Sequence, residues 1–136
     1  MTNRYDILFA TNRFNLSEPK AHFTNPCCYG DDTAAWIRSK LTSIGVKTTE
    51  PAQEDWGWHL DVTHNQASYF LGIGGNPDSE TSGNQGQWRL MVQKHRSFTD
   101  KLLGKNKLSK DEQIITTLSQ IVGKEPDMKL LGTEEG

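Results

Sequence analysis

The sequence has few of the features that mark membrane and secreted proteins. None of its apolar runs approaches the roughly 20 residues needed to cross a bilayer, and its first residues lack the charged and apolar segments of a signal peptide. The two cysteines, Cys27 and Cys28, are neighbours, and a bridge between neighbours strains the peptide that joins them. With no disulfide framework in view we expect a reducing compartment, the cytoplasm, and no membrane partner.

An excess of positive charge is also missing. Fifteen Lys and Arg residues stand against seventeen Asp and Glu residues, which gives a net charge of -2. Phosphate backbones are bound by clustered basic side chains, so we expect no nucleic-acid partner. The one basic-leaning stretch, residues 94–110, is interrupted and followed by acidic residues, and we interpret it as a solvated helical face.

The pattern of a nucleotide-binding loop is absent as well. The glycine-rich segment 72–77 has neither a following lysine nor a following helix, so it does not predict a phosphate site, and we expect no cofactor. What the sequence does have is aromatic bulk: four Trp, five Phe and three Tyr in 136 residues. Large aromatic side chains bury much apolar surface each, and we expect one domain over residues 1–136.

Alternating apolar residues predict a β-meander in the middle of the chain. The first strand spans 56–64, the dipeptide Asn65-Gln66 forms a turn, and the second strand spans 67–74. In this register three apolar pairs share one face of the hairpin. They are Val62 with Tyr69, Leu60 with Leu71, and Trp58 with Ile73. A third strand spans 87–96, after a loop over 75–86 that we expect to be mobile because it is rich in Gly, Ser and Asn.

Further elements flank the meander and complete the prediction of fold class. Residues 4–10 and 13–17 are expected to form an N-terminal hairpin, in which Phe9 faces Phe14 and Ile7 faces Leu16. Apolar residues at helical spacing predict helices at about 32–44, 98–103 and 110–122, and residues 128–131 a short edge strand. Cap residues are expected at Asp31 or Asp32, at Ser97 with Asp100, and at Ser109 with Glu112. Antiparallel strands packed with helices make an α+β fold, mainly an antiparallel sheet.

Two blocks of sequence carry a resemblance. The first is Asn25-Pro26-Cys27-Cys28-Tyr29-Gly30-Asp31-Asp32, followed by Trp36-Ile37, and the second is Pro51-Ala52-Gln53-Glu54-Asp55-Trp56-Gly57-Trp58. Together they resemble a family of small uncharacterised bacterial proteins, and the similarity covers about the middle third of the chain. The resemblance implies a bacterial cytoplasmic domain and brings no catalytic residue with it.

Carboxylates next to a tryptophan are the first candidates for chemistry. Glu54 and Asp55 precede the strand that begins at Trp56, and a carboxyl group at such a strand entry is a candidate general acid or base. The catalytic candidates are therefore Glu54, Asp55 and His59. The alternative is a structural role, in which both carboxylates fix a corner of the chain and Trp56 and Trp58 belong to the core.

The face of the meander opposite the tryptophans supplies the candidate binding residues. They are Gly57, His59, Asp61, Arg89 and His95, provided that the third strand pairs in the register that brings Arg89 and His95 to the same face. Gly57 with Gly72 and Gly74 would leave a bare strip there, open to a ligand or a partner backbone. No short metal-ligand spacing is present, and no metal site is predicted.

The function that this sequence favours is a non-catalytic binding or interaction domain of a bacterial cytoplasmic accessory protein. Its partner would be a protein or a small ligand, because the chain shows an aromatic meander and no paired nucleophile and base. One alternative is a small hydrolase or lyase that uses Glu54 or Asp55 with His59. Another alternative is a structural homo-oligomer in which the tryptophan face is the interface between subunits.

Overall fold

The computed structural model describes residues 4–14, 30–77 and 86–135. Its elements in chain order are β1 (Arg4–Thr11), α1 (Asp31–Ser43), β2 (Lys47–Thr48), β3 (Ala52–Glu54), β4 (Gly57–His64), β5 (Ala67–Pro77), β6 (Gly86–Lys94), α2 (Phe98–Leu103), α3 (Gln113–Gly123) and β7 (Met128–Glu135). All seven strands join one sheet in the order β2-β4-β5-β6-β1-β7, with β3 also paired to β4. Every pairing is antiparallel, and the predicted α+β class is confirmed.

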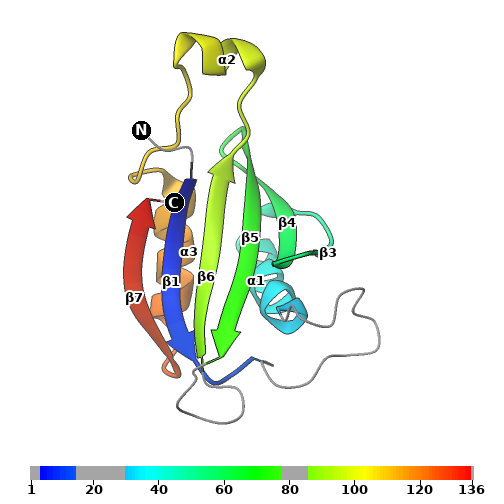
Figure 1. Ribbon diagram of the computed structural model, residues 1–136, viewed down its shortest axis with the longest axis vertical. Coiled ribbons are helices and arrows are strands. Elements are labelled where there is room, and N and C mark those ends of the chain that lie inside the picture. The colour runs from blue at the N-terminus through cyan, green and yellow to red at the C-terminus, as the bar shows by residue number, and fades with distance from the viewer. Residues whose placement is uncertain (1–3, 15–29, 78–85, 136) are drawn as a thin grey trace.

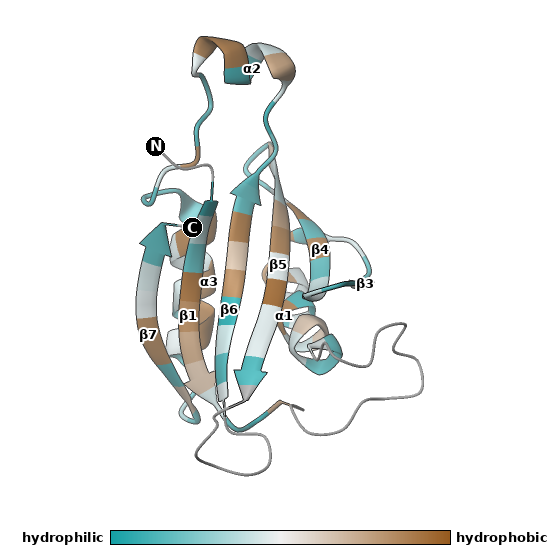
Figure 2. Ribbon diagram, viewed as in Figure 1, coloured by the Kyte–Doolittle hydropathy of each residue, from teal (hydrophilic) through white to brown (hydrophobic). Residues whose placement is uncertain are grey.

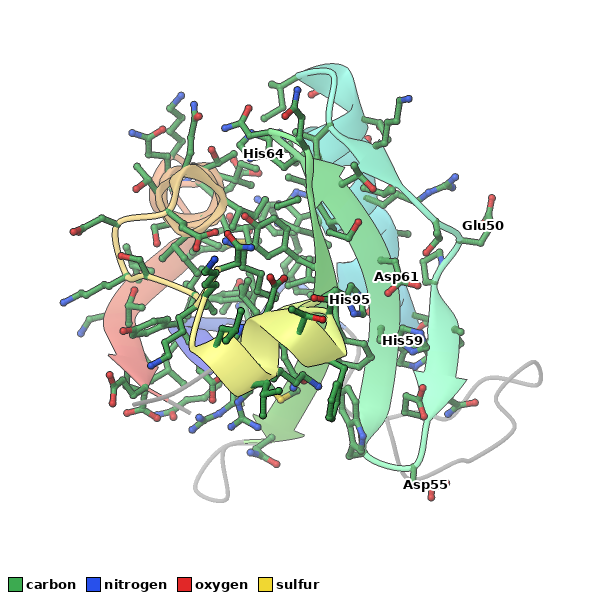
Figure 3. All side chains as sticks on the ribbon, turned by 90° about the horizontal axis from the view of Figure 1, so that it is seen from above. Glu50, Asp55, His59, Asp61, His64 and His95 are labelled. Carbon is green, nitrogen blue, oxygen red and sulfur yellow. The ribbon has the colours of Figure 1, made fainter. Side chains whose placement is uncertain are left out.

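The sheet is covered by helices on one side. Helices α1 and α3 lie behind the strands in Figure 1, and the view from above in Figure 3 shows them on the same side of the sheet. We call this side the covered face and the other side the open face. Helix α2 lies away from α1 and α3. Together with the segments that join it to β6 and α3, it forms an arm that projects beyond the strands. Successive side chains of each strand point to opposite sides of the sheet, so every strand contributes residues to both faces.

The hydrophobic core lies between the covered face and the two helices. Each strand turns every second side chain inward, and each helix turns one stripe toward the sheet. The largest fully buried side chains are Trp88, Phe9, Ile7, Ile37, Leu41, Leu60, Leu71, Ile73, Leu90, Ile114 and Leu118. A tryptophan at the centre of this layer accounts for much of the apolar area that the fold removes from water.

The meander forms in the predicted register. Val62 is opposite Tyr69, Leu60 opposite Leu71 and Trp58 opposite Ile73. The turn residues Asn65 and Gln66 both have positive φ, at 50° and 66°, as the predicted two-residue hairpin turn requires. The covered face of this hairpin is therefore apolar from Trp58 to Val62, and His64 ends the row.

The predicted N-terminal hairpin is wrong. β1 pairs with β6 along one edge and with β7 along the other, so neither edge is left for residues 13–17. Of that segment, Arg13 and Phe14 are described and lie outside any strand, while residues 15–17 lie outside the described residues. Phe14 does reach the core, where its ring lies 5.7 Å from the ring of Trp88. Phe14 is therefore buried as predicted, but it packs in the core of the whole sheet and not against Phe9 in a hairpin.

Several predicted boundaries shift. The loop expected over 75–86 is shorter, because β5 continues to Pro77 and β6 begins at Gly86; residues 78–85 lie outside the described residues. The last helix begins at Gln113 and not at 110, and the edge strand runs on to Glu135. The short strands β2 and β3 were not predicted. The neighbouring cysteines lie outside the described residues.

Only one of the three expected helix caps forms as predicted. Ser97 and Asp100 make a full capping box at the start of α2. The N-cap of α1 is Gly30, with Asp31 and Asp32 in the first turn. At α3 the N-cap is Glu112 with no side-chain cap. The Glu112 carboxylate does accept the backbone N–H of Ser109 at 3.2 Å, so one half of the predicted pairing forms, in the turn before the helix.

That carboxylate anchors the base of the α2 arm. Glu112 accepts a hydrogen bond from the hydroxyl of Tyr69 and another, 2.9 Å long, from the ammonium of Lys94. Burial would raise the pKa of Glu112, but the hydrogen bonds from Tyr69 and Lys94 outweigh it and hold the pKa below its usual value. Leu108, close by in the chain, is buried in the core. The arm is therefore tied to the sheet at its base while its tip stays outside.

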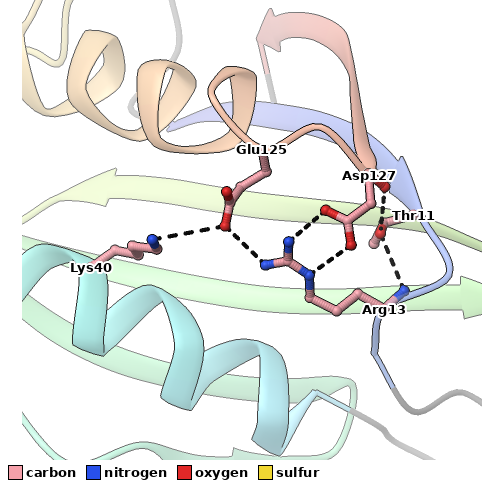
Figure 4. A network of polar contacts seen from close by, with 5 residues as sticks. All are labelled: Thr11, Arg13, Lys40, Glu125 and Asp127. Carbon is pink, nitrogen blue, oxygen red and sulfur yellow. Dashed lines mark hydrogen bonds and ion pairs between the residues drawn. The ribbon is translucent and has the colours of Figure 1, made fainter.

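A second polar cluster closes the other end of the sheet (Figure 4). The Arg13 guanidinium binds the Asp127 carboxylate with two nitrogens and the Glu125 carboxylate with the third, and Lys40 lies 3.8 Å from Glu125. Thr11 donates a hydrogen bond to the backbone carbonyl of Asp127. This latch joins the end of β1 to the turn between α3 and β7. Hydrogen bonds from Arg13 lower the pKa values of both carboxyl groups.

The latch predicts acid-sensitive stability. A carboxyl group with a lowered pKa in the folded state stabilises the fold above its ordinary pKa and loses this contribution as the pH falls through the lowered value. We expect Arg13→Gln to flatten the fall of the unfolding free energy below about pH 4, measured by urea denaturation at a series of pH values. Lys129→Gln, which removes an exposed cation of β7, is the control and should keep the wild-type slope. Equal slopes in wild type and Arg13→Gln would contradict the latch.

Candidate binding site

The register of the sheet brings the predicted binding residues to the open face. His59 is paired with Gly72, which is paired with Met91, and Gly74 is paired with Arg89. Asp61 lies opposite Phe70 on the same face. His95 follows β6 and donates its backbone N–H to Ser68, so it also stands at this side of the strand ends. The sequence left the register of the third strand open. In the structure, β6 pairs with β5 in the register that brings Arg89 to the same face as His59 and Asp61.

Trp56 is the main correction to the sequence prediction. We expected it to share the core face of Trp58, but β4 begins one residue later, at Gly57, and Asp55 and Trp56 form the turn between β3 and β4. Gly57 has φ 159° and a Cβ there would lie 2.2 Å from the carbonyl oxygen of Ile73, so only glycine fits. The chain changes direction at this glycine, and the indole of Trp56 moves to the open face, where it is 45% exposed.

The indole fills the strip of glycines that was expected to be bare. A Cβ on Gly72 would lie 2.8 Å from the Trp56 ring and 3.1 Å from the Met91 methyl group, so both side chains lie close against the backbone there. Gly57 itself is buried. The surface that remains is a cleft of about 380 Å³ beside the indole, lined by Arg4, Trp56, Phe70, Met91 and Gln93. We call it the aromatic cleft.

His59 forms one wall next to this cleft. Its ring stacks on Phe70, with centroids 4.9 Å apart and an angle of 17° between the planes. Its Nδ1 atom lies 2.8 Å from Glu54 Oε1, a close approach without the alignment of a hydrogen bond. Trp56 lies against the same Phe70 ring at 6.1 Å. Phe70 is therefore the centre of an aromatic group, and Glu54 fixes its polar edge.

A charged network borders the cleft on the side of β1. Asp6 is completely buried although it lies on the open face, because Arg4 binds both of its oxygens at 2.9 Å and Arg89 binds it from β6. Arg89 also contacts Glu134 of β7 at 3.0 Å. The hydrogen bond with Asp6 raises the pKa of Arg89 above its ordinary value. The predicted binding residue Arg89 is therefore held by two carboxylates, while Arg4 is the cation that lines the cleft.

The last two predicted residues form a pair at the other border. His95 Nε2 lies 3.5 Å from Asp61 Oδ1, and both side chains are about half exposed. Figure 3 shows Asp61, His59 and Asp55 following one another along the β3–β4 edge, with His95 reaching toward them from beneath α2. Across residues 4–14, 30–77 and 86–135, no group of three His, Cys, Asp or Glu side chains is arranged to hold a metal ion.

Sequence reasoning missed the residues that line the cleft and found only those that border it. Arg4, Phe70, Met91 and Gln93 were not selected, although Phe70 breaks the polar pattern of its strand face and Gly72 lies two residues beyond it. An aromatic residue and a glycine at alternate positions of an exposed face indicate that a large ring covers the glycine. The sequence alone does not say that the ring comes from Trp56, because that depends on the turn at Gly57.

Comparison with known proteins adds no relative: no family model, no curated protein and no solved structure matches this chain. The site therefore has to be interpreted from its own residues. What the geometry offers is an apolar centre with a charged border, held on a rigid sheet.

Substitution by alanine should cost much stability at Gly57 and little at Gly72. In Gly57→Ala the new Cβ meets the backbone oxygen of Ile73, which cannot move alone, so we expect a loss of about 3 kcal/mol of stability. In Gly72→Ala the Cβ meets the movable ends of Trp56 and Met91, so stability should change by less than about 1 kcal/mol while the indole is displaced. Chemical denaturation measures the first effect, and a shift of the Trp56 indole N–H resonance measures the second. Similar stability losses in both variants would refute this view of the turn.

Proposed function

We propose that the chain is a non-catalytic binding domain that docks a protein partner on the open face of its sheet, with the aromatic cleft at the centre of the contact. The observation that carries the proposal is Trp56, an indole held against Gly72 and left 45% exposed among Phe70 and Met91. Tryptophan is costly to leave in water, and it is enriched among the residues that dominate binding energy at protein interfaces.

The arrangement of side chains around Trp56 matches the anatomy of a protein interface. Such interfaces have an apolar centre rich in aromatic residues and methionine, enclosed by a polar border. Here the centre is Trp56, Phe70 and Met91. The border consists of the Glu54–His59 contact, the Asp61–His95 pair and the network around Asp6. Charges that are already paired cost less to desolvate than single ones, which suits a surface that has to shed its water on binding.

The shape of the cleft favours a side chain of a partner protein over a small free ligand. Its volume of about 380 Å³ is at the lower end of ligand sites, and it lies open on a sheet surface. A planar or branched apolar side chain would fill it, with Arg4 and Gln93 available for polar contacts at the rim. A bacterial cytoplasmic accessory protein, without cofactor or nucleic-acid partner, is the setting that we propose for this binding.

Removal of the indole tests the proposal. We expect Trp56→Ala to fold and to lose capture of a specific protein from an extract of the source cells, with affinity reduced by about 30-fold, the effect of losing a dominant interface residue. Leu131→Ala, at an exposed leucine of β7, is the matched control and should capture as wild type does. A variant of Trp88 would not test the same point, because Trp88 is buried in the core and its removal would damage the fold. Equal capture by wild type and Trp56→Ala would refute the proposal.

One observation favours the enzymatic alternative. Glu54 lies 2.8 Å from His59, within the distance that a hydrolase or lyase with these two residues as acid and base would need, although the two groups are not aligned as a hydrogen bond. The stacking of His59 on Phe70 also accounts for this geometry without catalysis. The variant Glu54→Gln separates the two roles: an enzyme would lose turnover, whereas a binding domain should keep its partner with an affinity changed by only a few-fold.

A further inference from the structure

Helix α2 exposes apolar side chains that the fold does not use. Phe98 is 80% exposed, Leu102 73% and Leu103 58%, and no residue of α2 is buried. Figure 2 shows hydrophobic stretches of α2 in brown at the tip of the arm, away from the strands and from α1 and α3. Three large apolar side chains gathered on one protruding element mark an interaction surface, whereas single exposed ones are common.

The arm is held in a defined conformation by its own hydrogen bonds. Ser97 and Asp100 form the capping box, and Gly104 ends the helix with φ 66°. Arg96 donates hydrogen bonds to the backbone carbonyls of Asp100 and Lys105, one on each side of the turn, at 3.0 Å. These contacts order a short helix that would be unstable alone. Since the helix adds no buried surface to the core, its order serves a contact outside the chain.

Charge is distributed unevenly between the arm and the β3–β4 edge. Residues 94–110 contain the cations Lys94, Arg96, Lys101, Lys105, Lys107 and Lys110 against the single anion Asp100. Residues 48–88 contain no Lys or Arg and six acidic residues, of which Glu50, Glu54, Asp55 and Asp61 lie on β3, β4 and the segments that flank them. Lys94 is bound to Glu112 at the base of the arm and Glu50 is paired with Arg38 of α1, so the remaining charges make the arm basic and the β3–β4 edge acidic, while the net charge of the chain is only -2.

Both surfaces lie on the same side of the molecule. In the view from above, α2 and the turn that carries Asp55 stand on the side of the sheet away from α1 and α3. Two surfaces on one side of a chain are both accessible to a second copy that approaches from that side around a two-fold axis. A contact of this kind uses the same pair of surfaces twice and closes after two subunits.

We propose that the partner of the open face is a second copy of this chain, with α2 of each subunit docked on the β3–β4 turn and aromatic cleft of the other. Phe98 and its two leucine neighbours cover Trp56 and Phe70 of the other subunit, and the lysines of the arm face Asp55 and Asp61. Complementary charge and apolar character are both contained in one sequence, and a net charge near zero does not oppose association. This inference rests on the proposed function and names the partner.

A charge-swap experiment tests it directly. Variant one is Lys101→Glu with Lys105→Glu, and variant two is Asp55→Lys with Asp61→Lys. Each variant alone places like charges opposite one another in both contacts, so we expect the dimer dissociation constant to rise about tenfold or more, measured by sedimentation velocity over a micromolar to millimolar range. In an equimolar mixture both contacts pair opposite charges again, and dimers that contain one copy of each variant should form with near wild-type affinity.

Matched controls separate a specific contact from general effects. Lys124→Glu with Lys129→Glu changes the net charge as variant one does, but outside the arm, and should leave dimerisation unchanged. Phe98→Ser with Leu102→Ser should weaken the dimer at least as much as charge reversal. At concentrations low enough for both proteins to be monomeric, the melting temperature should stay the same, because α2 has no buried residue. Leu130→Ser with Leu131→Ser removes two exposed leucines of β7 and should not affect the dimer.

Three outcomes would overturn the inference. They are a chain that is monomeric at every concentration, a dimer that the arm variants do not weaken, and a mixture of the two charge variants that fails to associate. If the chain is monomeric but Trp56→Ala still abolishes capture of another protein, the proposed function stands and only the identity of the partner is wrong. If neither association nor capture depends on Trp56, both proposals fail.

Discussion

The pairing of β4 with β5, set by the two-residue turn at Asn65 and Gln66, decides which side chains meet the helices and which meet water. A slip of one residue in this pairing would turn the apolar row outward and the polar row inward. The register thus keeps Leu60, Leu71 and Ile73 in the core and places His59 and Phe70 on the open face. The aromatic cleft depends on the same pairing, because Trp56 rests on a glycine of β5. Core and surface site are two sides of one ladder of backbone hydrogen bonds.

The sequence predicted this ladder because its pattern is local. Alternation with period two, a turn dipeptide and three matched apolar pairs agree within twenty residues, and no distant information is needed. The same kind of reasoning failed at the N-terminus. Ile7 and Phe9 do face a core, but their neighbours come from β6 and β7, about eighty and more than a hundred residues away. A periodic pattern shows that a strand has a buried face and does not show which strands lie beside it.

Trp56 illustrates a second limit of prediction from sequence. Strict alternation puts it with Trp58, and only the close approach of Gly57 to Ile73 reverses that assignment. One glycine in an unusual conformation was enough to change the role of the residue before it. For His59, Asp61, Arg89 and His95, the alternation was correct and the pairing register supplied the missing part. The side-chain partners of Arg89, by contrast, came from β1 and β7, two elements that the sequence did not bring near it.

The arm that carries α2 has a consequence for how such a chain changes over time. Its tip shares no side chain with the core, and Glu112, Tyr69 and Lys94 hold its base whatever sequence lies beyond them. Substitutions at the tip therefore leave folding nearly untouched, whereas substitutions along β4 and β5 alter folding and recognition together. Under the proposed function, binding specificity can change at the tip while the scaffold stays fixed. A new preference would be acquired first at the tip, where variation carries the smallest penalty.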